Sequence, residues 1–251
     1  EAPRGQSAAA MPRDNASPED GNTDGSPENE GDLDDLAAWE RGDISTESVL
    51  PTFRVSVDPS GVSVVATSGH GDAFRIEDGE DRVTIQRRLR SLAADGGVSL
   101  QLAITANIVG SQREFLKLGV LGLLAKSQAD VAKYLGVHES SISRALPDTY
   151  VATVHGIFPL RFFFSASVPH HSGRKLSARA VRAAIRTRVL QERPDDPLTD
   201  DRIAEWLVDI GFSIARRTVA KYRHVLQIPD ARDRRGGNWR SGADSGPVSA
   251  G

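Results

Sequence analysis

Residues 129–146 have a spacing typical of two short helices that cross at a tight turn. Ala132 is small where two helices must cross closely, and Gly136 follows four residues later, where the turn between them needs a positive φ. Ile142 comes six residues after that and points inward from the second helix. This spacing predicts a helix-turn-helix, although a plain helical hairpin remains an alternative. The side chains left to face a major groove are His138, Glu139, Ser140, Ser141 and Arg144.

A second stretch, residues 203–226, repeats this organisation with more positive charge. Gly211 ends its first helix, and the second helix has a separate apolar stripe to bury. The cations outside that stripe are Arg216, Arg217, Lys221 and Arg223. Arginine can bind O6 and N7 of guanine with two hydrogen bonds, whereas a lysine such as Lys221 serves equally well as a phosphate contact. This stretch therefore predicts a second helix-turn-helix, with a basic recognition helix.

Three more arginines lie on one face of the helix expected over 177–192. They are Arg179, Arg182 and Arg186. A solvated helix face and a set of phosphate contacts explain them equally well beside two DNA-binding candidates.

Catalytic and metal-binding patterns are missing from this sequence. It has no cysteine, no phosphate-binding glycine loop and no His-Glu-x-x-His motif. The pair His170 and His171 lies among Pro, Ser and Gly residues and reads as a linker. We therefore expect a protein that is not an enzyme, with no catalytic residues, no cofactor and no metal. No apolar run reaches about 18 residues, so we expect no membrane partner and a cytoplasmic location.

Charge is distributed unevenly along the 251 residues. Residues 1–81 contain 5 basic and 19 acidic side chains, whereas residues 82–251 contain 26 basic and 15 acidic ones. The formal net charge of −3 is therefore the sum of an acidic N-terminal segment and a basic remainder of the chain. The basic remainder indicates a polyanionic partner.

The surrounding elements are predicted to be mainly α-helical modules. Residues 53–57 and 62–65 flank Asp58-Pro59-Ser60-Gly61 and predict a β-hairpin near 53–65, and residues 74–76 add an extended piece. Helical spacing begins at Val83 and includes two helices separated by a Gly-Gly turn. Residues 1–50 are predicted to be a disordered acidic N-terminus, in which only 32–40 could form a short amphipathic helix.

Within the second predicted helix-turn-helix, the sequence resembles a known family. Residues 215–223, Ala-Arg-Arg-Thr-Val-Ala-Lys-Tyr-Arg, resemble the signature box of the sigma-54 family of bacterial RNA polymerase sigma factors. The family usually continues with Glu, where this chain has His224. Residues 137–144 look like the family's other helix-turn-helix, with Ser141 where Thr is commoner. The resemblance extends from about Gln112 to Arg235.

The resemblance implies that both predicted helix-turn-helix units recognise promoter DNA. The upstream GG element of minus-24/minus-12 promoters would be contacted by Arg216, Arg217, Lys221, Tyr222 and Arg223, although the spacing alone makes Tyr222 equally a core residue. The residues from His138 to Arg144 would lie toward the minus-12 element. The implied partners are double-stranded promoter DNA, core RNA polymerase and an ATP-dependent activator. The Gln- and Leu-rich region on which the activator acts is not found, so the resemblance is to a short or N-terminally truncated form.

The same resemblance divides the chain into five segments. They are a disordered acidic segment (1–50), a reduced core-polymerase-binding region (51–120), a central helix-turn-helix domain (121–172), a C-terminal helix-turn-helix domain with the signature box (173–235) and a flexible tail (236–251). Two other functions remain open. One is a DNA-binding repressor or partition-type protein, and the other is a degenerate sigma relative that no longer recruits polymerase.

Overall fold

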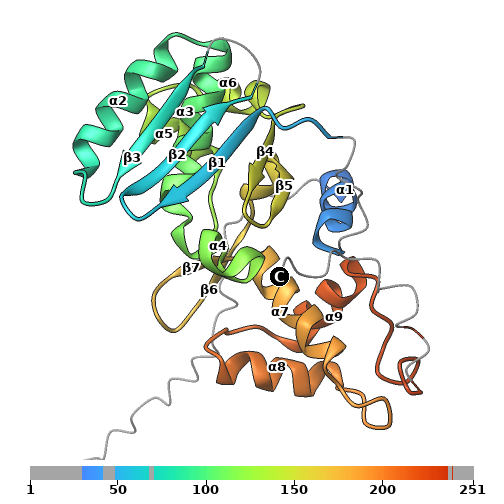
Figure 1. Ribbon diagram of the computed structural model, residues 1–251. Helices are drawn as coiled ribbons and strands as arrows, with labels where there is room; N and C mark the ends of the chain where they lie inside the picture. Colours follow the sequence, from blue (N-terminus) through green and yellow to red (C-terminus); the bar gives the residue numbers. More distant parts are fainter. Residues whose placement is uncertain (1–29, 42–48, 68–70, 237–238, 240–251) are drawn as a thin grey trace, which may run out of the picture.

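Helices make up about half of the described chain, and one five-stranded sheet packs against the helices in the upper part of Figure 1. The computed structural model describes residues 30–41, 49–67, 71–236 and 239. The predicted mainly α-helical class is confirmed. In this part of the chain, no helix is both long and apolar enough to cross a membrane.

The predicted β-hairpin is present and forms two of the five strands of the sheet. Strands β1 (Phe53–Asp58) and β2 (Gly61–Ala66) pair antiparallel, with Val57 opposite Val62. The Asp58 carboxylate accepts the backbone N–H of Ser60, which stabilises the turn between them. The extended piece predicted at 74–76 is strand β3 (Ala73–Glu77), which pairs antiparallel with β2.

Two further strands join this hairpin from a distant part of the chain. Strands β4 (Tyr150–Thr153) and β5 (Gly156–Pro159) form a second hairpin, and β4 pairs parallel with β1, with Phe53 opposite Val151. The strand order is β3-β2-β1-β4-β5. The expected regions 51–120 and 121–172 therefore share one sheet, and the boundary near residue 120 does not separate two cores.

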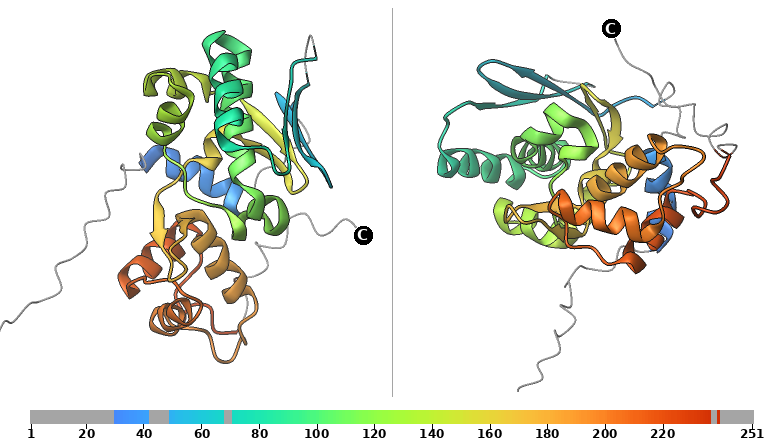
Figure 2. Two further views of the ribbon diagram at one scale, coloured as in Figure 1. Left: turned by 90° about the vertical axis from the view of Figure 1, so that its left-hand side faces the viewer. Right: turned by 90° about the horizontal axis from the view of Figure 1, so that it is seen from below.

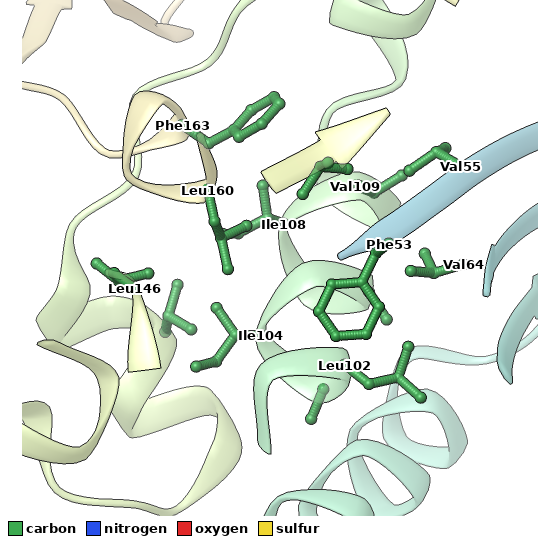
Figure 3. Close-up of a cluster of buried hydrophobic side chains, with 14 of the residues drawn as sticks. Phe53, Val55, Val64, Leu102, Ile104, Ile108, Val109, Leu146, Leu160 and Phe163 are labelled. Carbon is green, nitrogen blue, oxygen red and sulfur yellow. The ribbon is translucent and has the colours of Figure 1, made fainter. Parts of the chain in front are cut away.

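A helix buried on all sides organises the larger core. Helix α3 (Gly97–Ser111) is apolar around its whole circumference, and all its residues from Leu102 to Val109 are buried. Figure 3 shows side chains from α3 meeting those from the sheet and from the segment after it. Helices α2 (Arg82–Ala94), α5 (Gln128–Leu135) and α6 (Glu139–Ala145) also pack on α3. The first helix-turn-helix is thus built on a rigid centre.

The remaining short elements lead from this core into a second, smaller one. They are α4 (Arg113–Leu118), the 3₁₀ helices η1 (Gly119–Gly122) and η2 (Leu160–Phe163), and strands β6 (Ser167–Pro169) and β7 (Lys175–Ser177). The second core lies among α7 (Ala178–Leu190), α8 (Asp200–Asp209) and α9 (Arg216–Val225), in the lower part of Figure 1. Trp239, in the expected tail, packs against this core; the rest of that tail beyond Gly236 lies outside the described residues.

Helix α1 (Glu30–Arg41) lies at the junction of the two cores (Figures 1 and 2). Leu36 and Ala37 are buried, with exposed fractions of 4% and 1%. The expectation of disorder is therefore wrong for residues 30–41, where the predicted short helix forms because its apolar side finds a partner surface. The other residues of the acidic segment up to position 29, and 42–48, lie outside the described residues.

Candidate nucleic-acid interface

The first helix-turn-helix has the predicted geometry. Ser127 caps α5 by accepting the backbone N–H of Asp130 at 3.0 Å, and Gly136 ends the helix at φ 72°. Ala132 and Ile142 are buried where α5 and α6 meet. Because these interactions depend on near neighbours in sequence, the spacing alone was sufficient to predict the unit.

Helix α2 holds the C-terminal end of α5 in place. Arg90 Nε and Gln86 Nε2 each donate a hydrogen bond to the carbonyl oxygen of Tyr134, both at 2.9 Å. These bonds satisfy a carbonyl that the last helical turn leaves without an intrahelical partner. Burial raises the pKa of the Tyr134 phenol. The turn of the unit is consequently supported from outside as well as by Gly136.

Most of the predicted contact residues of this unit lie on the exposed side of α6. His138, Glu139, Ser140 and Arg144 are exposed, and Ser141 is half-buried. His138 also has a structural role, because its Nδ1 accepts the backbone N–H of Ser140 at 3.2 Å and so caps α6. Arg144 Nε donates to the Ser140 carbonyl at 3.1 Å. Their contact with DNA stays a prediction, and the structure places four of them on α6 and His138 at its N-cap.

The second helix-turn-helix is formed by α8 and α9. Thr199 caps α8 by accepting the backbone N–H of Arg202, and Asp200 and Asp201 occupy the first helical turn. Gly211 has φ 101° in the turn, and Val219 is fully buried against α8. The predicted unit is therefore present in the structure.

Three of its predicted contact residues lie together on the exposed side of α9. Arg216, Arg217 and Lys221 are exposed. Arg216 forms an ion pair with Asp201 at 3.4 Å, but both side chains are more than half exposed, so this pair leaves the guanidinium accessible. Within the described residues, Arg217 and Lys221 make no hydrogen bond or ion pair. This face offers free positive charge at the N-terminal half of the recognition helix.

Arg223 corrects the sequence prediction. Its side chain is 6% exposed, its Nε donates to Asp200 Oδ1 at 2.9 Å, and its Nη1 donates to the Ile228 carbonyl at 2.8 Å. A guanidinium committed to these partners inside the unit cannot also reach a base edge. The position of Arg223 outside the apolar stripe predicts a contact with DNA. In the structure, the ion pair with Asp200 on α8 holds its side chain inside the unit.

Tyr222 has a mixed environment. Its ring packs against the second core, and the guanidinium carbon of Arg182 lies 5.3 Å from the ring centroid. It is half-buried, so its role as a contact remains a prediction.

Helix α7 does not present its arginines to solvent as predicted. Arg179 and Arg182 are each 2% exposed and form ion pairs with Glu40 of α1. The prediction of phosphate contacts is therefore wrong for these two residues, because both guanidinium groups are buried against the Glu40 carboxylate. Arg186 is half-buried and donates from Nη2 to the Arg41 carbonyl at 3.0 Å, so it also faces α1, and its phosphate contact stays only a prediction.

Glu40 is the residue that sequence analysis missed. A signal was available, since an acidic segment with an apolar stripe and an arginine-bearing helix face are complementary in charge. Glu40 lies 139 positions from Arg179 and 142 from Arg182, so no local sequence pattern could pair it with them. Among the described residues, no group of three or more His, Asp or Glu side chains is placed to bind a metal ion.

Two helix-turn-helix units, one with free cations on its recognition helix, define a DNA-binding protein. The family model for the sigma-54 DNA-binding domain matches residues 98–236, which is more than half of the chain. This chain therefore belongs to the sigma-54 factor family.

Curated relatives agree with this assignment. The RNA polymerase sigma-54 factor of Acinetobacter guillouiae is 42% identical over 134 residues, which cover 53% of this chain and 28% of that protein. The corresponding factor of Pseudomonas aeruginosa is 33% identical over 189 residues, covering 75% of this chain and 37% of that protein. The chain thus spans about a third of the length of these relatives. Among solved structures, Aquifex aeolicus sigmaN bound to promoter DNA matches with 26% identity and a TM-score of 0.44, covering 76% of this chain and 62% of that one.

Proposed function

We propose that this chain recognises promoter DNA of the minus-24/minus-12 class as a sigma-54-type factor. Helix α9 reads the upstream GG element, with Arg217 and Arg216 as base contacts and Lys221 as a phosphate contact. Helix α6 lies toward the minus-12 element and presents His138, Glu139, Ser140, Ser141 and Arg144. Tyr222 and Arg186 are secondary contacts in this proposal, at the edge of the α9 surface.

The observation that carries the proposal is the division of charge on α9. The signature box contains four cations, and the fold withdraws Arg223 into a buried ion pair while it leaves Arg216, Arg217 and Lys221 exposed. Exposed arginines at the N-terminal end of a recognition helix suit the two acceptors that each guanine offers in the major groove. The match of residues 98–236 to the sigma-54 DNA-binding domain, which includes α9, supports this proposal.

Core RNA polymerase is the second proposed partner. In this proposal residues 51–120, which comprise the first hairpin, β3 and helices α2 to α4, contribute the polymerase contact. The chain acts by binding in the cytoplasm. The polymerase supplies the chemistry of RNA synthesis, and a separate ATP-dependent activator supplies any energy for opening the promoter.

A gel-shift experiment tests both partners. A duplex with both elements is compared with one in which GG is scrambled, each with and without core polymerase. A GG-dependent complex that is shifted further by polymerase supports the proposal, whereas GG-dependent binding without the further shift indicates a relative that no longer recruits polymerase.

Arg217→Ala is the informative variant, and Arg54→Ala is its matched control. Arg54 is an exposed arginine on β1, outside both helix-turn-helix units. Removing either side chain changes the net charge equally, so only a base contact explains a selective loss at GG. Equal affinity of the wild-type chain for GG and scrambled duplexes would reject sequence-specific recognition and favour general DNA binding.

A further inference from the structure

Three consecutive residues at the end of α1 contact both cores. Trp39 packs on the sheet, with its ring centroid 6.3 Å from that of Tyr150 and 6.2 Å from that of Phe158. Arg41 reaches the other core, where its Nη1 donates to the Val225 carbonyl at the end of α9. We call Trp39, Glu40 and Arg41 the strap.

Glu40 lies at the centre of the strap and is almost completely enclosed. Its side chain is 1% exposed, with Oε1 2.7 Å from Arg179 Nη1 and Oε2 2.6 Å from Arg182 Nε. Charged hydrogen bonds of this kind are short and directional, and they are strengthened where water is excluded. Two arginines one helical turn apart therefore fix the carboxylate along the axis of α7.

The two arginines in turn connect Glu40 to opposite sides of the junction. Arg179 donates from Nε to the Phe162 carbonyl and from Nη2 to the Phe164 carbonyl, both in the segment that follows the sheet. The guanidinium of Arg182 lies over the ring of Tyr222 on α9. One buried carboxylate thus joins the body that carries α6 to the helix that supports α9.

Helix α7 has a separate attachment at its N-terminal end. The backbone N–H of Ser177 donates to the Leu123 carbonyl, and that of Ala125 donates to the Lys175 carbonyl, each at 3.0 Å. This attachment, together with the packing of α7 on η1, holds the N-terminal end of α7 on the larger core. The strap attaches α7 further along its length, through Arg182 and Arg186.

We infer that Glu40 is a positioning residue that sets the spacing between the two DNA elements read by one chain. This inference rests on the proposed function. The strap holds α6 and α9 at a fixed separation and angle, so the chain can engage both elements only when the DNA presents them in the matching register. Each base pair added between them moves one element by about 3.4 Å and rotates it by about 35°. Such a change exceeds what a rigid junction tolerates.

A distance measurement tests the strap without DNA. The chain has no cysteine, so Ser143→Cys on α6 and Ser213→Cys before α9, both at exposed positions, accept spin labels at two defined sites. Pulsed electron paramagnetic resonance should give a narrow distance distribution for the otherwise wild-type chain. Glu40→Gln should broaden it at least about twofold, because the amide NH₂ then faces an arginine. Glu77→Gln, which removes an exposed carboxylate on β3, is the matched control and should leave the distribution narrow.

Binding to a series of duplexes tests the consequence for specificity. The spacing between the two elements is varied by one and two base pairs in each direction, and affinity is measured by fluorescence anisotropy. We expect the wild-type chain and Glu77→Gln to lose at least about tenfold in affinity for each one-base-pair change. Glu40→Gln should bind all spacings within about threefold, and should bind a duplex carrying only the GG element as well as the wild-type chain does.

Trp39→Ala provides a second variant that leaves the buried ion pairs intact. It detaches the strap from the sheet, so it should broaden the distance distribution and flatten the spacing profile in the same way. A narrow distribution, or a wild-type spacing profile, in both variants overturns the inference. Loss of folding in both variants, seen by circular dichroism, also overturns it, because the strap would then be required for folding rather than for positioning. If the wild-type chain shows no preference for either element, the proposed function fails while the distance measurement still decides the strap.

Discussion

Arg223 and Asp200 form a two-point ion pair inside the second helix-turn-helix. Arg223 Nε lies 2.9 Å from Asp200 Oδ1, and Nη2 lies 3.2 Å from Oδ2. The pair ties the last turn of α9 to the first turn of α8 and so fixes the angle at which the recognition helix is presented. Of the four cations in the signature box, one therefore stabilises the helix-turn-helix and three are exposed on its surface.

Arg223→Ala should destabilise the chain strongly, whereas Arg216→Ala should not. Removing Arg223 leaves the Asp200 carboxylate and the Ile228 carbonyl without their partner, at a cost of about 3 kcal/mol in unfolding free energy. Arg216 is paired only at the exposed surface, so its removal should cost less than about 1 kcal/mol. Urea unfolding followed by circular dichroism measures both. A similar cost for the two variants would contradict a structural role specific to Arg223.

Arg217→Ala and Lys221→Ala should weaken DNA binding in different ways. Loss of a base-reading arginine should reduce discrimination between GG and scrambled duplexes by about 1–3 kcal/mol. Loss of a phosphate-binding lysine should weaken binding to both duplexes and reduce the slope of affinity against salt by about 1. Titrations at several salt concentrations separate the two effects. Equal losses on both duplexes for both variants would remove Arg217 from the set of base contacts.

Gly211→Ala should be much more destabilising than Gly136→Ala. At Gly136 (φ 72°) an alanine Cβ would lie 3.5 Å from Arg90 Nε, so only the left-handed backbone is penalised, by about 1–2 kcal/mol. At Gly211 (φ 101°) the added atom would lie 2.5 Å from His170 Nε2, which is hydrogen-bonded to the Ile210 carbonyl. We expect at least about 2 kcal/mol more for Gly211→Ala. Thermal unfolding of the two variants makes the comparison. Equal melting temperatures would contradict this prediction, because they would show that the His170 ring moves away from the added Cβ without a cost in stability.

The first hairpin should weaken in acid through Asp58. Hydrogen bonds from Arg75 and from Ser60 hold the pKa of the Asp58 carboxyl well below its usual range. A carboxyl with a lowered pKa stabilises the folded chain at neutral pH, and this contribution is lost as the pH falls below about 4. Asp58→Asn should therefore be less stable than the wild-type chain at about pH 6, and the difference should shrink by about pH 3. Urea unfolding at the two pH values provides the measurement, and a difference independent of pH would contradict this role of the charge.

The sequence by itself determined the local units of this protein. Each helix-turn-helix depends on a small residue, a turn glycine and an inward-facing apolar residue that lie within about a dozen positions of one another. The caps at Ser127 and Thr199 and the turn at Asp58 depend on even closer neighbours. Interactions of this range are formed by the chain segment itself, so residue type and spacing suffice to predict them, and family resemblance then follows from the same residues.

Only the tertiary structure decided which cations remain exposed and how the units are joined. Helical spacing places Arg179, Arg182 and Arg223 on polar faces, but it does not say whether a carboxylate from another element will meet them. Glu40 and Asp200 do so from other helices, and strand β4 likewise reaches β1 across almost a hundred positions. The physical reason is that burial of an arginine becomes favourable only when a buried acceptor neutralises it. That acceptor is brought close by the folding of the whole chain, and no local pattern records it.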